Sequence, residues 1–447
     1  MTKRRSRNLF AEAGAALRKA NHAFAQAHPG EGSGRQPVHT VYGGAQLFTA
    51  DTVPKLGALA LEAMDRYAPS PDALGVALGI GRHPAIGAID QRVRDKLARE
   101  PVEDFRIDFE DGYGNRPDAE EDGHALAVAG AVSAGMRQGT LSPFIGIRVK
   151  PLNEELRERS IRTLDLVLTG VVEGGGLPER WVVTIPKITV IEQVEYAVAA
   201  LRKLERKLGL AAGALRFEVM VETPQVILDS SGCSLLPRML EVSDGRLRGA
   251  HFGTYDYTAG VNITAAYQLM RHPACDFAKH AMQVAFAGTP VWLSDGSTTV
   301  MPVPVHREAA DGPALTDAQH EANLKSVHAA WRLHFDDVRH SLIGGFYQGW
   351  DLHPAQLVSR YAALYSFFLD GVEAAGARLR NFLGKAAQAT LVGDVFDDAA
   401  TGQGLLNFFL RGLNSGAITE AEALTMTGLS AEEFRGRSFQ KILRART

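Results

Sequence analysis

The sequence contains only two cysteines, Cys233 and Cys275, in 447 residues. Two thiols cannot build the disulfide framework of a small secreted domain, and no Cys-x-x-Cys pair is present to hold zinc or carry out redox chemistry. The sequence also lacks an apolar run of about 18 residues, and its basic N-terminus leads into an Ala-rich amphipathic stretch where a signal peptide would have an apolar core. These absences predict a soluble, cytoplasmic protein with no membrane partner.

The chain also lacks an excess of charge of either sign. Its 48 Lys and Arg oppose 51 Asp and Glu, for a formal net charge of −3. This balance offers no field to steer the protein onto nucleic acid, so we expect a small-molecule substrate and no nucleic-acid partner. A composition of 45% hydrophobic and 22% charged residues is that of a folded globular protein and excludes a wholly disordered, collagenous or coiled-coil chain.

Three segments follow from the pattern along the chain. Residues 1–36 are predicted to form an N-terminal helical arm, with a helix from Asn8 to Ala27 followed by the breaker-rich stretch HPGEGSGRQP, and we expect the arm to pack on the main body. Residues 37–357 are predicted to form a (β/α)8 barrel that is the catalytic domain. Residues 358–447 have a mostly helical pattern and are predicted to form a C-terminal helical subdomain.

The central segment alternates short apolar runs with amphipathic helical stretches. Eight such runs are present, at Val38–Gly44, Asp104–Gly112, Phe144–Lys150, Trp181–Ile188, Arg216–Pro224, Leu247–Tyr257, Thr289–Gly296 and Ile343–Pro354. The polar residues that end six of them are 34 to 40 positions apart, which is the length of one strand plus one helix: Asp108, Arg148, Lys187, Glu222, Asp256 and Asp295.

Eight strand-and-helix units with polar groups at the strand ends predict a closed (β/α)8 TIM barrel of the α/β class. An open nucleotide-binding sheet is the weaker alternative, because no Gly-rich phosphate-binding sequence follows the first strand. Two departures from an even barrel, the long first unit at 48–102 and an insertion at 301–316, are expected to border its mouth.

Glu222 and Asp256 end neighbouring strands, so both should lie at the mouth of the barrel. Two carboxylates, with water completing the oxygen shell, suit Mg²⁺ or Mn²⁺, whereas zinc would favour histidines or thiols. They are the predicted metal ligands. The alternatives are a helix-capping role for Glu222 and a surface turn for Asp256.

The second strand ends in three acids, Asp108, Glu110 and Asp111, and the third strand contains Arg148. An arginine that points into a barrel presents a planar fork suited to a carboxylate or a developing oxyanion. We predict catalytic roles for Arg148, Glu110 and Asp111. A solvated acidic loop and a buried Arg148–Glu110 ion pair are the alternatives.

Lys187 ends the fourth strand, in TIPKI, and Thr254 ends the sixth, in HFGTYDY; both are predicted to bind substrate together with Arg148. Schiff-base chemistry at Lys187 is disfavoured, because nearby carboxylates would keep its ammonium charged. His353 is either a base or, more commonly before a proline, a capping residue. His272, Cys275 and His280 are expected to be core and surface residues and not a zinc site.

Six short motifs occur in order at barrel spacing: IDFEDGYG, IGIRVK, TIPKI, FEVMVETP, HFGTYDYTAG and GWDLHPAQ. Together they resemble the citrate lyase β-subunit and malyl-CoA lyase branch of the HpcH/HpaI aldolase superfamily, which is related to malate synthases. The resemblance covers roughly Val38 to Gln356. It implies Mg²⁺ held by Glu222 and Asp256, a 2-oxo acid oxygen held by Arg148, and Glu110 and Asp111 in the outer shell.

The resemblance thus implies a metal-dependent carbon–carbon lyase or aldolase that acts on a small 2-oxo or hydroxy acid, or on its CoA thioester, through a metal-stabilised enolate. Phosphoryl transfer on pyruvate or phosphoenolpyruvate and a non-catalytic carboxylate-binding barrel are the alternatives. Tyr255 and Lys150 depart from the family pattern, where an acid and an asparagine are usual. The C-terminal acids Asp394, Asp397 and Asp398 are candidates to complete the site, and we expect a homo-oligomer.

Overall fold

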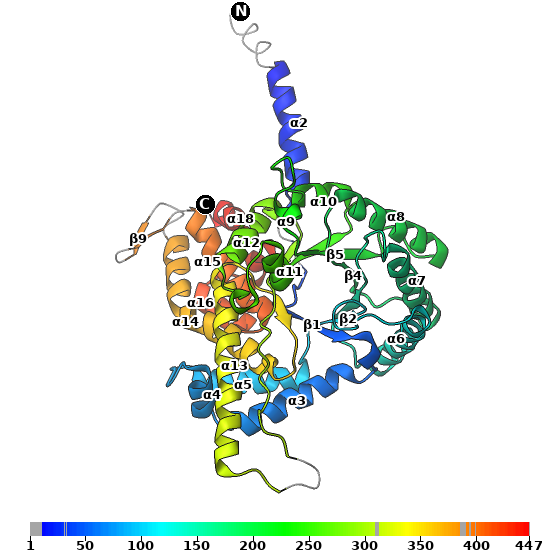
Figure 1. Cartoon of the computed structure of the whole chain (residues 1–447). Coiled ribbons are helices and arrows are strands. Elements are labelled where there is room, and N and C mark those ends of the chain that lie inside the picture. Colours follow the sequence, from blue (N-terminus) through cyan, green and yellow to red (C-terminus); the bar gives the residue numbers. More distant parts are fainter. Residues whose placement is uncertain are drawn as a thin grey trace, which may run out of the picture.

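The computed structural model describes residues 11–30, 32, 34–308, 313–384, 390–392, 395–397 and 399–446. Eight parallel strands form one sheet in the order β7-β6-β5-β4-β3-β2-β1-β8, which curls into a nearly closed barrel (Figure 1). The strands are β1 (His39–Gly44), β2 (Asp104–Asp108), β3 (Phe144–Arg148), β4 (Trp181–Ile185), β5 (Arg216–Val221), β6 (Leu247–Phe252), β7 (Trp292–Ser294) and β8 (Gly349–Asp351). Each lies within one predicted run, so the predicted (β/α)8 barrel is confirmed.

The barrel closes between its two shortest strands, β7 and β8. Residues that follow β7 complete the seam: Ser297 bridges Trp350, and the Trp350 amide donates to the Gly296 carbonyl at 3.1 Å. The Asp295 amide donates to the Gln348 carbonyl at 2.9 Å. The two end strands of the sheet, β7 and β8, are therefore joined through hydrogen bonds of the loop that follows β7.

Helices follow the strands around the barrel. They are α3 (Thr52–Tyr67), α4 (Pro71–Leu78) and α5 (Ile86–Arg99) after β1, then α6 (Asp118–Gln138), α7 (Arg157–Glu173), α8 (Ile191–Leu208), α9 (Pro224–Ile227), α10 (Leu236–Val242), α11 (Thr254–Gly260), α12 (Pro273–Phe286), α13 (Asp317–Ile343) and α14 (Gln356–Gly384). The short helices η1 (Ala45–Leu47) and η2 (Ala265–Tyr267) lie in loops. The C-terminal region adds α15 (Ala399–Ser415), α16 (Glu420–Thr427), α17 (Ala431–Gly436), α18 (Phe439–Arg446) and a hairpin of β9 (Thr390–Val392) and β10 (Val395–Asp397).

The inside of the barrel is layered, because alternate residues of each strand face inward. Near the strand starts, the fully buried Arg106 donates to Asp104 at 2.7 Å and to Glu218 at 2.9 Å. A small apolar cluster of Tyr42, Met220 and Trp350 fills the middle. This apolar layer separates the polar groups at the strand starts from those at the carboxyl-terminal mouth.

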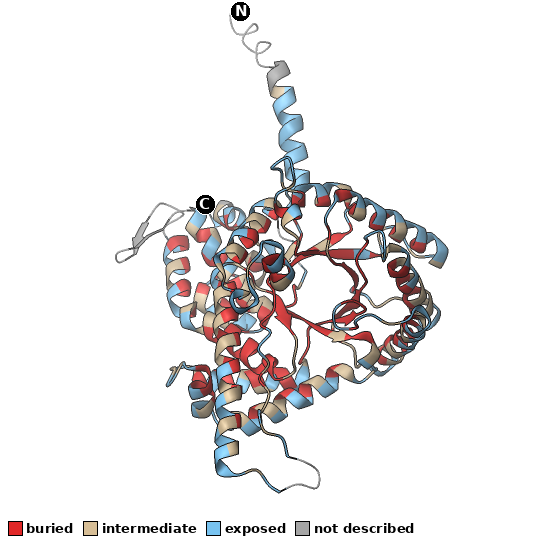
Figure 2. Cartoon of the chain, in the orientation of Figure 1, coloured by how far each residue is buried: buried red, intermediate tan, exposed pale blue. Residues whose placement is uncertain are grey.

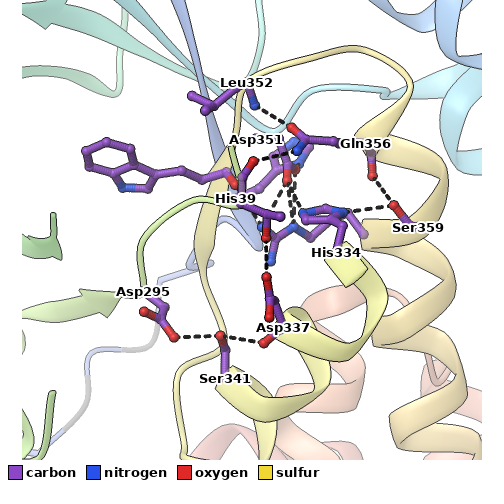
Figure 3. A network of polar contacts seen from close by, with 12 residues as sticks. His39, Asp295, His334, Asp337, Ser341, Asp351, Leu352, Gln356 and Ser359 are labelled. Carbon is purple, nitrogen blue, oxygen red and sulfur yellow. Dashed lines mark hydrogen bonds and ion pairs between the residues drawn. The ribbon is translucent and has the colours of Figure 1, made fainter. Parts of the chain in front are cut away.

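A buried polar network joins the barrel to α13 and α14 (Figure 3). Asp351, at the end of β8, accepts a hydrogen bond from His39 Nδ1 at 2.7 Å and from Arg360 Nε at 3.1 Å. His334 Nε2 lies 3.0 Å from Asp351, and His334 Nδ1 lies 2.8 Å from the Ser359 hydroxyl. Although Ser359, His334 and Asp351 have the order of a catalytic triad, all three are buried, so we assign them to structure.

The N-terminal helix α2 (Ala11–Ala27) projects away from the barrel (Figures 1 and 2). Its residues from Ala15 to Ala27 are exposed, including Leu17 at 60% and Phe24 at 65%. The expectation that the arm packs on the main body is therefore wrong for this helix, whereas the residues after it do contact the barrel: the Gly30 amide donates to the Gly288 carbonyl at 2.8 Å, and Arg35 donates to Glu100 at 3.0 Å. Within the described ranges, no helix is long and apolar enough to cross a membrane.

Candidate active site

Arg148 and Asp108 end the adjacent strands β3 and β2, whose register places them side by side. Arg148 Nε and Nη2 donate to the two carboxylate oxygens of Asp108 at 2.7 and 2.5 Å. The third nitrogen, Nη1, lies 3.1 Å from Glu110 Oε2 and 3.6 Å from Asp111 Oδ2. The ion pair of Arg148 with Glu110, which the sequence left as the alternative, is therefore present, and the main partner of Arg148 is Asp108.

Lys187 brings the loop after β2 to the end of β4. Its ammonium lies 2.5 Å from Glu110, 3.2 Å from Asp111 and 3.3 Å from Asp256. Its backbone has a φ of 50°, and its amide donates to Glu222 Oε1 at 2.7 Å. One residue thus contacts four of the predicted site carboxylates, in a left-handed conformation that a non-glycine residue adopts only when its surroundings hold it there.

Glu222 follows β5 and is buried, whereas the Asp256 side chain, in the first turn of α11, is 43% exposed. Gly253 precedes α11 and allows the two segments to approach, since a Cβ at this position would lie 2.5 Å from Glu222 Oε2. The structure therefore brings both predicted metal ligands to the same side of the mouth, with Lys187 between them.

The site is strongly acidic. Burial and the neighbouring charge of Asp256 raise the pKa of Glu222 to about 8. Burial also raises the pKa of Glu110 to about 7, although Arg148 and Lys187 oppose the shift. For Lys187, burial alone would lower the pKa, but Glu222, Glu110 and Asp111 outweigh it, and the net shift is upward. The lysine is thus a charged ammonium, and the fit to a Schiff-base nucleophile is poor.

The residues of the mouth leave room for a cation. Five acidic side chains (Asp108, Glu110, Asp111, Glu222 and Asp256) and only two basic ones, Arg148 and Lys187, meet here. A cavity of about 340 Å³ is lined by Lys187, Glu222 and Asp256.

Among the described residues, no three His, Cys, Asp or Glu side chains converge as a complete metal-binding set. Mg²⁺ does not need such a set, because it commonly binds one or two carboxylates and fills its remaining positions with water and substrate oxygens. Glu222 and Asp256 are carboxylates of the kind that Mg²⁺ and Mn²⁺ take as ligands.

The predicted substrate-binding residue Thr254 and the two departures from the family pattern, Tyr255 and Lys150, lie around this centre. Thr254 is buried at the start of α11, and its hydroxyl has no hydrogen-bond partner. Tyr255 donates to the Ser297 carbonyl at 2.9 Å and accepts from the Thr299 amide at 3.1 Å, so it fixes the loop after β7. Lys150 donates to the Phe109 carbonyl at 2.8 Å. The departures at 255 and 150 thus have structural roles.

The other polar candidates lie outside the cluster of acids around Lys187. His353 Nδ1 accepts from the Ala355 amide at 3.2 Å and His272 Nδ1 from the Ala274 amide at 3.1 Å, so each orders the backbone at the start of a helix. Asp295 is buried against Lys279, at 3.0 Å. Asp394 and Asp398 lie outside the described residues, and of Asp397 only the backbone is described.

An aromatic pair inside the barrel was not predicted from the sequence. The rings of Tyr42 and Trp350, from β1 and β8, lie 4.5 Å apart, and the Arg148 guanidinium lies 4.9 Å from the centre of the Tyr42 ring. The Tyr42 ring packs against the face of the guanidinium, while Asp108 accepts hydrogen bonds from its edge. Both aromatics fall within predicted strands, but only the register of β1 with β8 reveals that they meet.

Residues 17–442 match the sequence model of DUF6986, described as a domain of unknown function. No curated protein matches the chain in sequence. Among solved structures, a citrate lyase from Burkholderia xenovorans LB400 is similar over 75% of this chain and 91% of its own, with 18% identity and a TM-score of 0.54.

The Haloferax volcanii malate synthase, solved with magnesium and glyoxylate, aligns over 92% of this chain and 97% of its own, with 13% identity and a TM-score of 0.47. At these identities the citrate lyase shows a shared fold, and the malate synthase similarity is too weak to add to it.

Proposed function

The chain belongs to the DUF6986 family, and we propose that it is a divalent-metal-dependent carbon–carbon lyase or aldolase acting on a small 2-oxo or hydroxy acid. One observation carries the proposal. Five carboxylates, an arginine and a lysine from four neighbouring strand ends and α11 meet at the carboxyl-terminal mouth of the barrel, where catalytic residues of this fold gather.

In this proposal, Glu222 and Asp256 hold Mg²⁺ or Mn²⁺ through one carboxylate each. The bound ion would supply positive charge beside the carboxylate and carbonyl oxygens of a 2-oxo acid. Lys187 keeps the two carboxylates in place, because its amide donates to Glu222 at 2.7 Å and its ammonium lies 3.3 Å from Asp256.

Arg148 would bind the substrate oxygen on which negative charge develops. Its Nε and Nη2 are used by Asp108, but Nη1 makes no hydrogen bond of good geometry, since Glu110 Oε2 has no hydrogen-bond partner despite lying 3.1 Å away. Beside its ion pair with Glu110, Nη1 can therefore donate to a ligand oxygen. A fixed donor aimed at a developing oxyanion stabilises the transition state without reorganising.

Cleavage of a carbon–carbon bond beside a hydroxyl needs a group that takes the hydroxyl proton and a group that returns a proton to the enolate carbon. Glu110 is suited to both transfers, because it is buried at the mouth and burial raises its pKa to about 7. Its carboxylate would take the hydroxyl proton, and its carboxyl form would then donate a proton to the enolate carbon. Asp111, whose side chain is 58% exposed, would hold Lys187 from the solvent side.

A second cavity, of about 350 Å³, lies where β1 and β8 end. Apolar side chains such as Leu47, Phe48 and Leu352 line it, and Tyr42 connects it to Arg148. An apolar lining suits the carbon chain of an aldehyde or of a CoA thioester. We therefore propose that the second substrate enters here.

The test is an assay for release of a 2-oxo acid from short 4-hydroxy-2-oxo acids and from CoA thioesters of 3-hydroxy acids whose hydroxyl-bearing carbon also carries a carboxylate. We expect release that requires Mg²⁺ or Mn²⁺ and that Glu222→Gln abolishes. Full turnover by Glu222→Gln would refute the proposal. Exposed Glu158 provides the matched control, Glu158→Gln, which should keep wild-type activity.

A further inference from the structure

The amino-terminal end of the barrel, opposite the candidate active site, contains a cavity of about 520 Å³. Residues at or next to the starts of successive strands line it, so it opens on the face where TIM barrels do not carry their catalytic groups. Three of these residues are arginines on neighbouring strands: Arg180 precedes β4, Arg216 begins β5 and Arg248 lies in β6.

Aromatic rings of the same cavity support two of the arginines. The guanidinium carbon of Arg248 lies 3.6 Å from the centre of the Trp292 ring, and that of Arg180 lies 4.9 Å from the centre of the Phe144 ring. A guanidinium stacked by its face keeps its N–H donors at the edge, where they can bind an oxyanion. The rings therefore hold the donors in place without satisfying them.

No carboxylate of the described ranges forms an ion pair with any of the three arginines. Burial and the charges of Arg216 and Arg180 together lower the pKa of Arg248 to about 10. Positive charge is thus concentrated here at a cost in free energy, and a bound anion would relieve it.

Deeper in the cavity the lining is polar and acidic. Asp104, Glu218 and His251 line it, and Asp104 Oδ1 is buried without a hydrogen-bond partner. Asp104 and Glu218 would repel a negative group, so the negative group of a ligand should bind at the arginines of the rim. The unpaired Asp104 Oδ1 can accept a hydrogen bond from a ligand hydroxyl or a water deeper in the cavity. Glu179 also lines the rim and is exposed to solvent.

We propose that Arg180, Arg216 and Arg248 form a binding site for a small multivalent oxyanion, of the phosphate or polycarboxylate class, separate from the catalytic mouth. The two sites lie at opposite ends of the barrel, with the apolar layer of Tyr42, Met220 and Trp350 between them. The proposal therefore does not depend on the proposed function.

The test is calorimetric titration of the metal-free full-length protein with inorganic pyrophosphate and, separately, with citrate, at matched ionic strength. We expect saturable binding of at least one anion that weakens as salt is added. Binding of pyrophosphate alone assigns the site to phosphates, binding of citrate alone to polycarboxylates, and binding of both to either class; each supports the site.

Arg216→Gln and Arg248→Gln should each raise the dissociation constant roughly tenfold or more, the effect of losing a hydrogen bond to a charged group. Arg216 is exposed, so its variant should fold, which an unchanged melting temperature verifies. The matched control Arg82→Gln, at an exposed loop position, and Glu222→Gln at the mouth should leave binding unchanged. Absence of saturable binding, an equal loss in Arg82→Gln, or a loss in Glu222→Gln would overturn the proposal.

Discussion

Arg148 donates two hydrogen bonds, of 2.7 and 2.5 Å, to the two carboxylate oxygens of Asp108. The two residues end the adjacent strands β2 and β3 and are register partners, so the strand pairing itself places the guanidinium beside the carboxylate. With two nitrogens held by Asp108 and its face on the Tyr42 ring, the guanidinium has one orientation, and its third nitrogen faces Glu110. The position of the proposed oxyanion donor therefore follows from the strand pairing.

Arg148→Lys should remove most of the activity, because a lysine ammonium can neither form the fork with Asp108 nor keep a donor aimed at the substrate. We expect kcat/KM to fall by about 10²–10³, the usual effect of losing one preorganised oxyanion donor. Steady-state kinetics measures the loss, with Arg137→Lys, an exposed position on α6, as the control. Wild-type kcat/KM in Arg148→Lys would contradict the role of the fork.

Lys187 should not form a covalent intermediate, since three carboxylates within 3.3 Å keep its ammonium charged. Borohydride reduction in the presence of pyruvate should add no mass to the protein, whereas a Schiff base would be trapped as a stable adduct. Intact-mass spectrometry gives the answer. An adduct that disappears in Lys187→Arg would show that the lysine is the nucleophile.

Stability should decrease on acidification through His334. Burial lowers the pKa of His334 below its unfolded value of about 6.5, so the folded protein favours the neutral ring. The contribution of His334 is therefore complete above about pH 6.5 and is lost as the pH falls toward its lowered native pKa, by up to about 1.4 kcal/mol per pH unit.

The pKa of Asp351 is held well below its usual value, although burial alone would raise it, because the charge of Arg360 and the bonds from His334 and His39 outweigh burial. That second contribution is lost only below about pH 4.

Urea unfolding between about pH 7.5 and 5 tests this dependence. His334→Gln should have a flatter dependence than the wild type, whereas His280→Gln, at an exposed position on α12, should follow it. Equal slopes for the wild type and His334→Gln would show that another group controls acid stability.

The exposed apolar residues of α2 should be buried by self-association. Light scattering should give a mass that is a multiple of 48.2 kDa, and Leu17→Ser with Phe24→Ser should shift the assembly toward the monomer. Ala15→Ser with Ala20→Ser, also exposed on α2, is the matched control. A monomer mass that does not change with concentration would refute the predicted homo-oligomer.

The barrel could be predicted because its signals are local. Each strand is a short apolar run, and β2, β3 and β4 are buried along their whole length. Polar residues recur at the strand ends at one spacing, so the fold also predicts that Asp108, Arg148, Lys187 and Glu222 meet at the mouth. The predicted runs for β7 and β8 are much longer than the three-residue strands observed, because loop backbone supplies part of the pairing there.

The contacts that depend on three-dimensional register could not be predicted. His39, His334 and Asp351 form one network although 312 positions separate His39 from Asp351, and no local pattern distinguishes them from other buried polar residues. The same holds for the left-handed backbone of Lys187, which Glu222 and Glu110 stabilise from other strands. The position of α2 was wrongly predicted, because an amphipathic pattern does not say whether its apolar face is buried within the chain or against a partner.

The central claim is tested most directly by calorimetric titration of oxalate, which has the shape and charge of the pyruvate enolate, into metal-free protein, into protein with Mg²⁺, and into Glu222→Gln with Mg²⁺. The account predicts binding that requires Mg²⁺ and is lost in Glu222→Gln, with Glu158→Gln binding as the wild type does. Oxalate binding that is the same with and without Mg²⁺, or that persists in Glu222→Gln, would contradict a metal-dependent acid site at the mouth of the barrel.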